Sequence, residues 1–136
     1  MNKKTLFLML FSLVWLMPSL AQNRNVLSIP DFSIANAGQV VLPIDLENTA
    51  DVVAVQFTMQ VPSGISVDVT SATLNAARKN GHNLTFHSMG GNTFMCMIQS
   101  ARNKALSGSE GNLLTVALTK TASAATFTCP VTLSDV

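Results

Sequence analysis

Residues 52–61 read Val-Val-Ala-Val-Gln-Phe-Thr-Met-Gln-Val, and this stretch decides the fold. From Val53 onward, two sets of side chains alternate: Val53, Val55, Phe57, Met59 and Val61 in one set, and Ala54, Gln56, Thr58 and Gln60 in the other. Successive side chains of a β-strand point to opposite faces of a sheet. The alternation therefore predicts a strand with one buried face.

Short alternating segments recur along the rest of the chain, separated by glycine, proline and asparagine. The predicted strands are residues 26–34, 39–46, 53–61, 65–69, 83–88, 93–99, 113–118 and 126–133, eight in all. Residues 89–92 would connect a hairpin, and residues 73–81 would hold at most one helical turn. Pro43 lacks a backbone donor and should face a sheet edge or a bulge. Since no long helical period exists, the sequence predicts an all-β, two-sheet β-sandwich.

The first 21 residues have the pattern of a signal peptide. Lys3 and Lys4 precede an apolar core from Leu6 to Met17, and Ser19-Leu20-Ala21 is the expected cleavage site with small residues. The apolar stretch is shorter than the roughly 20 residues of a membrane-spanning helix and is stopped by Pro18, so no transmembrane segment is expected in the mature chain. We predict residues 22–136 as one domain that is secreted, periplasmic or at the cell surface.

Charge and aromatic content exclude some ligand classes. Without Lys3 and Lys4, the eight basic residues become six, against seven acidic residues, and no basic stripe is present. A nucleic-acid partner is therefore not expected. The chain has no tyrosine, and its one tryptophan, Trp15, lies in the leader. This counts against an aromatic platform for binding sugars.

The residues give little support to catalysis, so we do not predict an enzyme. His87 and Ser88 are neighbours that alternate to opposite faces of a strand, and no Gly-x-Ser-x-Gly elbow exists. The carboxylates lie mainly in turns, and cysteine and histidine lack metal-ligand spacing. A calcium site at Glu47 to Asp51 is conceivable, but solvated turn charge is the simpler interpretation. We expect no cofactor and no metal.

Four segments together resemble the cohesin-like domains of secreted bacterial proteins. They are Val52-Val53-Ala54-Val55-Gln56-Phe57, Val61-Pro62-Ser63-Gly64-Ile65, Arg78-x-x-x-His82 and Ser107-Gly108-x-x-Gly111-x-Leu113-Leu114. The resemblance covers about residues 26–136 and implies a jelly-roll topology in a superfamily that includes carbohydrate-binding modules. These segments are turns and strand patterns that carry no chemistry. For Arg78 and His82, spaced by four, we expect a structural role in place of ligand binding: the two side chains stack on one helical turn, or they contact loop carbonyls.

The resemblance also implies nine strands, whereas the sequence up to Val136 provides eight predicted strands. The ninth is then missing, supplied by another chain, or miscounted. If it is missing, the sheet edge beside the first strand is open to pairing, which is a route to dimerisation or aggregation.

Two cysteines raise the question of a disulfide, because an exported protein meets an oxidising compartment. By alternation, Cys96 and Cys129 both point into the core. In the resembled strand order their strands lie two spacings apart, about 9 to 10 Å, beyond the roughly 7 Å Cα limit for a bridge. We therefore expect free thiols.

The resemblance implies that one sheet binds a partner, with the strand order 126–133, 53–61, 93–99, 83–88. Its outward residues are Gln56, Thr58, Gln60, Thr85, His87, Met95, Met97, Gln99, Thr126 and Thr128. Flexible, polarizable methionines among glutamines and threonines suit protein recognition. The alternative is that a flanking segment covers Met95 and Met97.

Two function classes follow. The first is an exported, non-catalytic, cohesin-like module that docks a protein partner, dockerin-like by the resemblance, at or outside the cell envelope. The second is a carbohydrate-binding module that recognises polysaccharide through Gln, Asn and Thr side chains. The lack of exposed Trp and Tyr favours the first.

Overall fold

The computed structural model describes residues 24–30, 32, 34, 38–121 and 132–134. Eight strands lie in this part of the chain: β1 (Asn25–Ser28), β2 (Gln39–Asn48), β3 (Ala54–Gln60), β4 (Ile65–Leu74), β5 (His82–Gly90), β6 (Thr93–Ser100), β7 (Asn112–Lys120) and β8 (Thr132–Ser134). Apart from the first, fourth and last, their ends lie within two residues of the predicted bounds.

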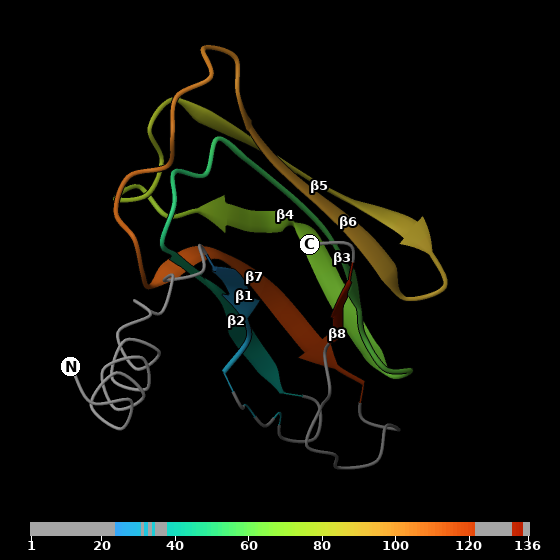
Figure 1. Ribbon diagram of the computed structural model, residues 1–136. Coiled ribbons are helices and arrows are strands. Elements are labelled where there is room, and N and C mark those ends of the chain that lie inside the picture. Colours follow the sequence, from blue (N-terminus) through green and yellow to red (C-terminus); the bar gives the residue numbers. More distant parts are fainter. Residues whose placement is uncertain (1–23, 31, 33, 35–37, 122–131, 135–136) are drawn as a thin grey trace, which may run out of the picture.

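The strands form two four-stranded sheets, ordered β1-β2-β7-β4 and β5-β6-β3-β8, with all neighbours antiparallel. Figure 1 shows the β5–β6 hairpin in one layer, and β1, β2 and β7 in the other. The predicted all-β, two-sheet sandwich is confirmed. The second sheet also has the strand order that the resemblance implied.

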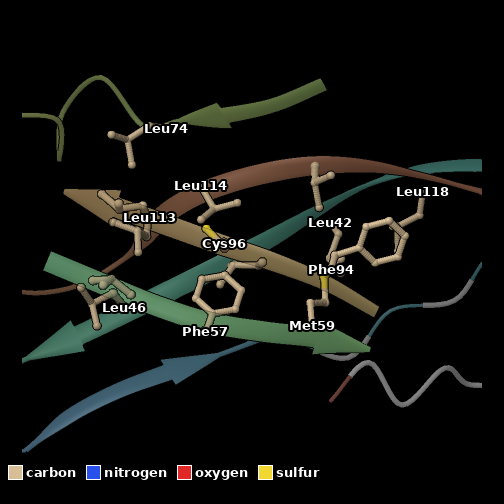
Figure 2. Close-up of a cluster of buried hydrophobic side chains, with 14 of the residues drawn as sticks. Leu42, Leu46, Phe57, Met59, Leu74, Phe94, Cys96, Leu113, Leu114 and Leu118 are labelled. Carbon is tan, nitrogen blue, oxygen red and sulfur yellow. The ribbon is translucent and has the colours of Figure 1, made fainter. Parts of the chain in front are cut away.

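The two sheets close over one apolar interior. In β3, Val55, Phe57 and Met59 are buried, whereas the intervening Gln56 is exposed and Thr58 half-buried. Leucines of β2 and β7 meet these residues from the opposite sheet, as Figure 2 shows. Burial of apolar surface stabilises the fold by about 25 cal/mol per Å². Val55, Phe57 and Phe94 share this interior, as the alternation predicts.

The prediction for Val53 was wrong. Val53 is 37% exposed and Val52 is 8% exposed, and β3 begins only at Ala54. The backbone carbonyls here make contacts outside the ladder. The Leu106 amide donates to the Val52 carbonyl at 2.8 Å, and Nε2 of His82 lies 2.9 Å from the Val53 carbonyl oxygen. The ladder alternation therefore starts one residue later.

The fourth strand is longer than predicted because it contains a large bulge. β4 advances from Asp68 to Thr73 while β7 advances only from Ala117 to Thr115. Inside the bulge, the Ser71 hydroxyl accepts a hydrogen bond from the Ala117 amide at 2.7 Å, in place of a backbone carbonyl. The bulge displaced the alternation, and this hid the second half of the strand from the sequence.

The segment of residues 73–81, expected to hold a helical turn, belongs partly to a strand and partly to a turn. Its start, to Leu74, belongs to β4, and one turn follows, in which the amides of Arg78 and Lys79 both donate to the Asn75 carbonyl. The first strand ends at Ser28, not at residue 34.

Pro43 lies, as predicted, where β2 has a free edge within the described chain and close to a register shift. β1 pairs with β2 only from Asp45 to Asn48, so no described strand flanks Pro43 on that side, and the ladder with β7 shifts register between Ile44 and Asp45. The missing proline donor therefore costs little.

The β5–β6 connection is tighter than the predicted four residues. Gly90 pairs with Thr93, which leaves Gly91 and Asn92 as the turn, with φ of 58° and 61°. Positive φ at both positions is the geometry of a type I′ turn, whose twist matches that of the strands. Gly90 itself belongs to β5, next to a register shift after Ser88.

Cys96 is fully buried between the sheets (Figure 2) and is a free cysteine, as expected. Burial raises the pKa of its thiol to about 12, because a thiolate is poorly solvated in the apolar interior. The prediction for Cys129 falls outside the described residues.

We predict that Cys96 is inert in the folded protein. In a Cys129→Ser variant at pH 8, only about one thiol in ten thousand is ionised, so a thiol-reactive dye should label the protein only after urea unfolding. Rapid labelling of the native variant, followed by absorbance, would contradict the burial described here.

Candidate functional site

The outer face of β3, β6 and β5 carries the predicted site residues in cross-strand rows. Met97 lies opposite Gln56 on β3 and Thr85 on β5. In the next row Met95 lies opposite Thr58 and His87. The flanking rows are Ala54–Gln99–Asn83 and Gln60–Thr93–Gly90. We call Gln56, Thr58, Gln60, Thr85, His87, Met95, Met97 and Gln99 the methionine face.

Exposure shows that these side chains point away from the core. Gln56, Gln60, Thr85, His87 and Gln99 are exposed, and Thr58, Met95 and Met97 are half-buried. In β6 they alternate with the buried Phe94, Cys96 and Ile98. Both methionines sit on the central strand of the three, so neighbours on both sides reduce their exposure.

The face is uncharged across the part of the sheet that the structure describes. No Asp, Glu, Lys or Arg occupies an outward position of β3, β5 or β6, and only His87 carries a titratable group. Amide and hydroxyl groups at the rim can exchange hydrogen bonds, while the thioethers offer polarizable apolar contact. This chemistry suits binding, and it supplies no nucleophile beside a base.

Sequence reasoning did not name three residues of this surface: Asn83, Ala54 and Thr93, which lies between Gln60 and Gly90. Asn83 is exposed and follows the same alternation as Thr85 and His87, and Ala54 lies in its row across Gln99. The alternation of β5 was sufficient to find Asn83. Thr126 and Thr128, predicted for the same face, lie outside the described residues.

The described residues form no recognisable metal site. Within them, no group of three or more His, Cys, Asp or Glu residues is placed to hold a metal ion. The stretch from Glu47 to Asp51 instead makes backbone contacts, such as the Asn48 amide donating to the Ser109 carbonyl at 2.8 Å.

Arg78 ties the loops at one end of the sandwich. Its guanidinium donates to Oδ1 of Asn48 at 2.7 Å and to the carbonyls of Leu46 at 3.4 Å and Glu110 at 3.5 Å, and the residue is only 3% exposed. Burial lowers the pKa of Arg78, since its partners in the described chain are neutral oxygens. The predicted contact with loop carbonyls is confirmed.

Gly108 completes this arrangement. It has a φ of 73°, and a Cβ there would lie 3.2 Å from Nη1 of Arg78. A side chain at this position would be strained and would press on the guanidinium. The Ser107-Gly108 segment is therefore explained by packing.

His82 is fully buried beside these loops, with Nε2 at 2.9 Å from the Val53 carbonyl oxygen. Because a carbonyl accepts, Nε2 carries the proton. The other ring nitrogen, Nδ1, is buried with no hydrogen-bond partner. Like Arg78, His82 connects a strand end to a loop and does not reach the methionine face.

No protein-family model matches the sequence, and no curated protein matches it either. Solved structures do resemble this chain in fold. The seventh ScaB type I cohesin from Pseudobacteroides cellulosolvens aligns with a TM-score of 0.70 at 12% identity, covering 81% of this chain and 73% of that chain. This chain has the cohesin fold.

Other cohesins extend the comparison. A non-cellulosomal cohesin from the archaeon Archaeoglobus fulgidus has a TM-score of 0.65 at 15% identity and covers 82% of this chain and 75% of its own. The type I cohesin–dockerin complex of OlpA from Clostridium thermocellum has a TM-score of 0.69 at 11% identity, covering 82% of each chain. At such identities the similarity establishes the cohesin fold of this domain, while residue roles depend on its own geometry.

Within the described residues, no helix has the length and apolar character needed to cross a membrane.

We predict that Arg78→Met destabilises the cohesin fold by about 2 kcal/mol, because it leaves buried oxygens of Asn48 and Leu46 without a donor. Arg102→Met is the matched control, since Arg102 is exposed in a loop. Urea unfolding followed by circular dichroism gives the difference. Equal midpoints for the two variants would show that the Arg78 contacts contribute nothing.

Proposed function

We propose that this protein is an exported, non-catalytic module that docks a protein partner through the methionine face. The observation that carries the proposal is the placement of Met95 and Met97 in adjacent rows of an exposed, uncharged sheet. A surface with a polarizable centre and a hydrogen-bonding rim resembles the core-and-rim composition of protein interfaces.

Fold neighbours support the class of partner. Two of the similar structures are cohesins in complex with dockerins, one from Clostridium thermocellum and one from Acetivibrio cellulolyticus with a Cel5 dockerin. The proposal for this chain is therefore a dockerin-like partner.

The absence of charge on the described face determines how binding responds to conditions. Affinity would come from shape, apolar contact and hydrogen bonds, with little electrostatic steering. Ionic strength should change it weakly, because screening acts on charges. The partner's contact surface should be uncharged as well, because a buried unpaired charge is costly.

Export follows from the predicted signal peptide at residues 1–21 and sets where docking takes place. We propose that the domain of residues 22–136 works outside the cytoplasm, as a secreted, periplasmic or cell-surface protein. One of the similar structures is a cohesin from a cell-surface anchoring scaffoldin of Ruminococcus flavefaciens, which supports this location by analogy.

We predict that Met97→Asp weakens docking at least about tenfold, since it places a desolvated carboxylate at the centre of the contact. The partner is first captured from culture fluid on the immobilised domain, identified by mass spectrometry and purified. Calorimetry with the purified partner then compares the variants.

Met89→Asp is the matched control for this experiment. Met89 is 56% exposed and lies at the tip of the hairpin, beside the register shift of β5. Its substitution should leave affinity within about twofold, as rim positions usually do. Unchanged affinity in Met97→Asp, or equal losses in both variants, would rule out the methionine face as the docking surface.

Polysaccharide recognition, the alternative from the sequence, has its own test. The described outward positions of β3, β5 and β6 carry no Phe, Tyr or Trp, and Phe86 stacks on Phe94 on the inner side, with ring centroids 6.1 Å apart. We expect a glycan array to bind no protein. A sugar bound reproducibly, and lost in Gln56→Ala, would replace docking by carbohydrate binding.

A further inference from the structure

Both sheets end on the same side of the sandwich. β1 is the border strand of its sheet, and none of the described strands pairs with its outer edge. On the opposite sheet, β8 pairs with β3 only from Thr58 to Gln60, so the first half of β3 has no neighbour on that side within the described chain. The core is therefore open between β1 and β3.

A groove of about 220 Å³ marks this opening. Its apolar lining comes from Leu27 of β1, Leu46 of β2, and Val52 and Val55 beside or in β3, while Asn25 and Gln56 add polar atoms. Leu27 also packs against the core cluster. The groove is thus an unclosed part of the interior and differs from a polar surface hollow.

The other side of β1 is hollowed too. Arg24, Val26, Glu47 and Thr49 line a second depression of about 190 Å³. A strand added to β1 would place alternate side chains toward the two hollows. The shape of this edge therefore matches an extended strand.

Within the four residues of this edge strand, no side chain blocks such pairing. β1 reads Asn-Val-Leu-Ser, without a charged residue, a proline or a bulge. Exposed edges that avoid pairing normally carry one of these features. By contrast, β4, the opposite border of the same sheet, contains Asp68 and a large bulge.

We propose that the occupant of the β1 edge is the β1 edge of a second copy of this chain. A two-fold axis normal to the sheet at Leu27 pairs Leu27 with its equivalent, Val26 with Ser28, and Asn25 with Ile29. Paired residues in an antiparallel ladder point to the same face, and this register keeps inward residues inward.

Charge favours this self-pairing. Every pair in the register is uncharged, so no like charges meet, and the contact is isologous, the commonest form of dimer interface. The two Leu27 side chains lie side by side where the two grooves meet. Each copy covers apolar surface of the other, and the two sheets join into one.

Sedimentation equilibrium of the purified, exported protein tests this inference with a pair of variants. Ser28→Lys and Ser66→Lys make the same change at exposed serines on β1 and β4, the two borders of one sheet. We expect a dimer at about 100 µM protein that dissociates on dilution. Ser28→Lys should raise its dissociation constant at least about tenfold, and Ser66→Lys should not change it.

Circular dichroism confirms that each variant is folded, and Asn25→Lys replaces Ser28→Lys if the latter unfolds. A monomer at every concentration would overturn the proposal, as would a dimer that is insensitive to both β1 variants or equally weakened by Ser66→Lys. Met97→Asp should leave the dimer intact, so the result is independent of the docking surface.

Discussion

The two-residue period of β3 and β6 governs the rest of this structure. Because Phe57, Met59, Cys96 and Ile98 must enter the interior, the residues between them are forced outward. Packing between the sheets thus places Met95 and Met97 on the surface side by side with their polar neighbours. The binding surface and the core are two sides of one constraint, and a register slip would destroy both.

The two ends of the sandwich are held by different means. At one end a type I′ turn closes the β5–β6 hairpin with local backbone geometry alone. At the other, Arg78 and His82 connect loops that are far apart in the sequence, such as residues 46–53 and 108–111. Between these ends, Met95 and Met97 of the central strand β6 remain on the outer surface of the sheet.

Alternation predicted most strands because it reports burial directly, and it gave the outward side of each strand. Grouping the methionine face also required the strand order that the resemblance implied. It failed where other contacts decided the backbone. Before β3, the carbonyls of Val52 and Val53 bond to the Leu106 amide and the His82 ring and do not join the ladder. In β4, the Ser71 hydroxyl accepts a hydrogen bond in place of a backbone carbonyl. Contacts between residues 29 or 46 positions apart leave no local signal. The groove beside β1 depends on how β1, β2 and β3 lie relative to one another, which no periodicity encodes.

The bulge in β4 has a consequence for how large an assembly can become. Between Asp68 and Thr73 the strand leaves its regular ladder, and the Ser71 hydroxyl occupies a backbone role. An edge strand with such a bulge is a poor template for pairing with another chain. A sheet that can pair at its β1 edge but not at its β4 edge adds only one further copy. Its subunits therefore form a closed dimer, and this sheet does not extend into fibres.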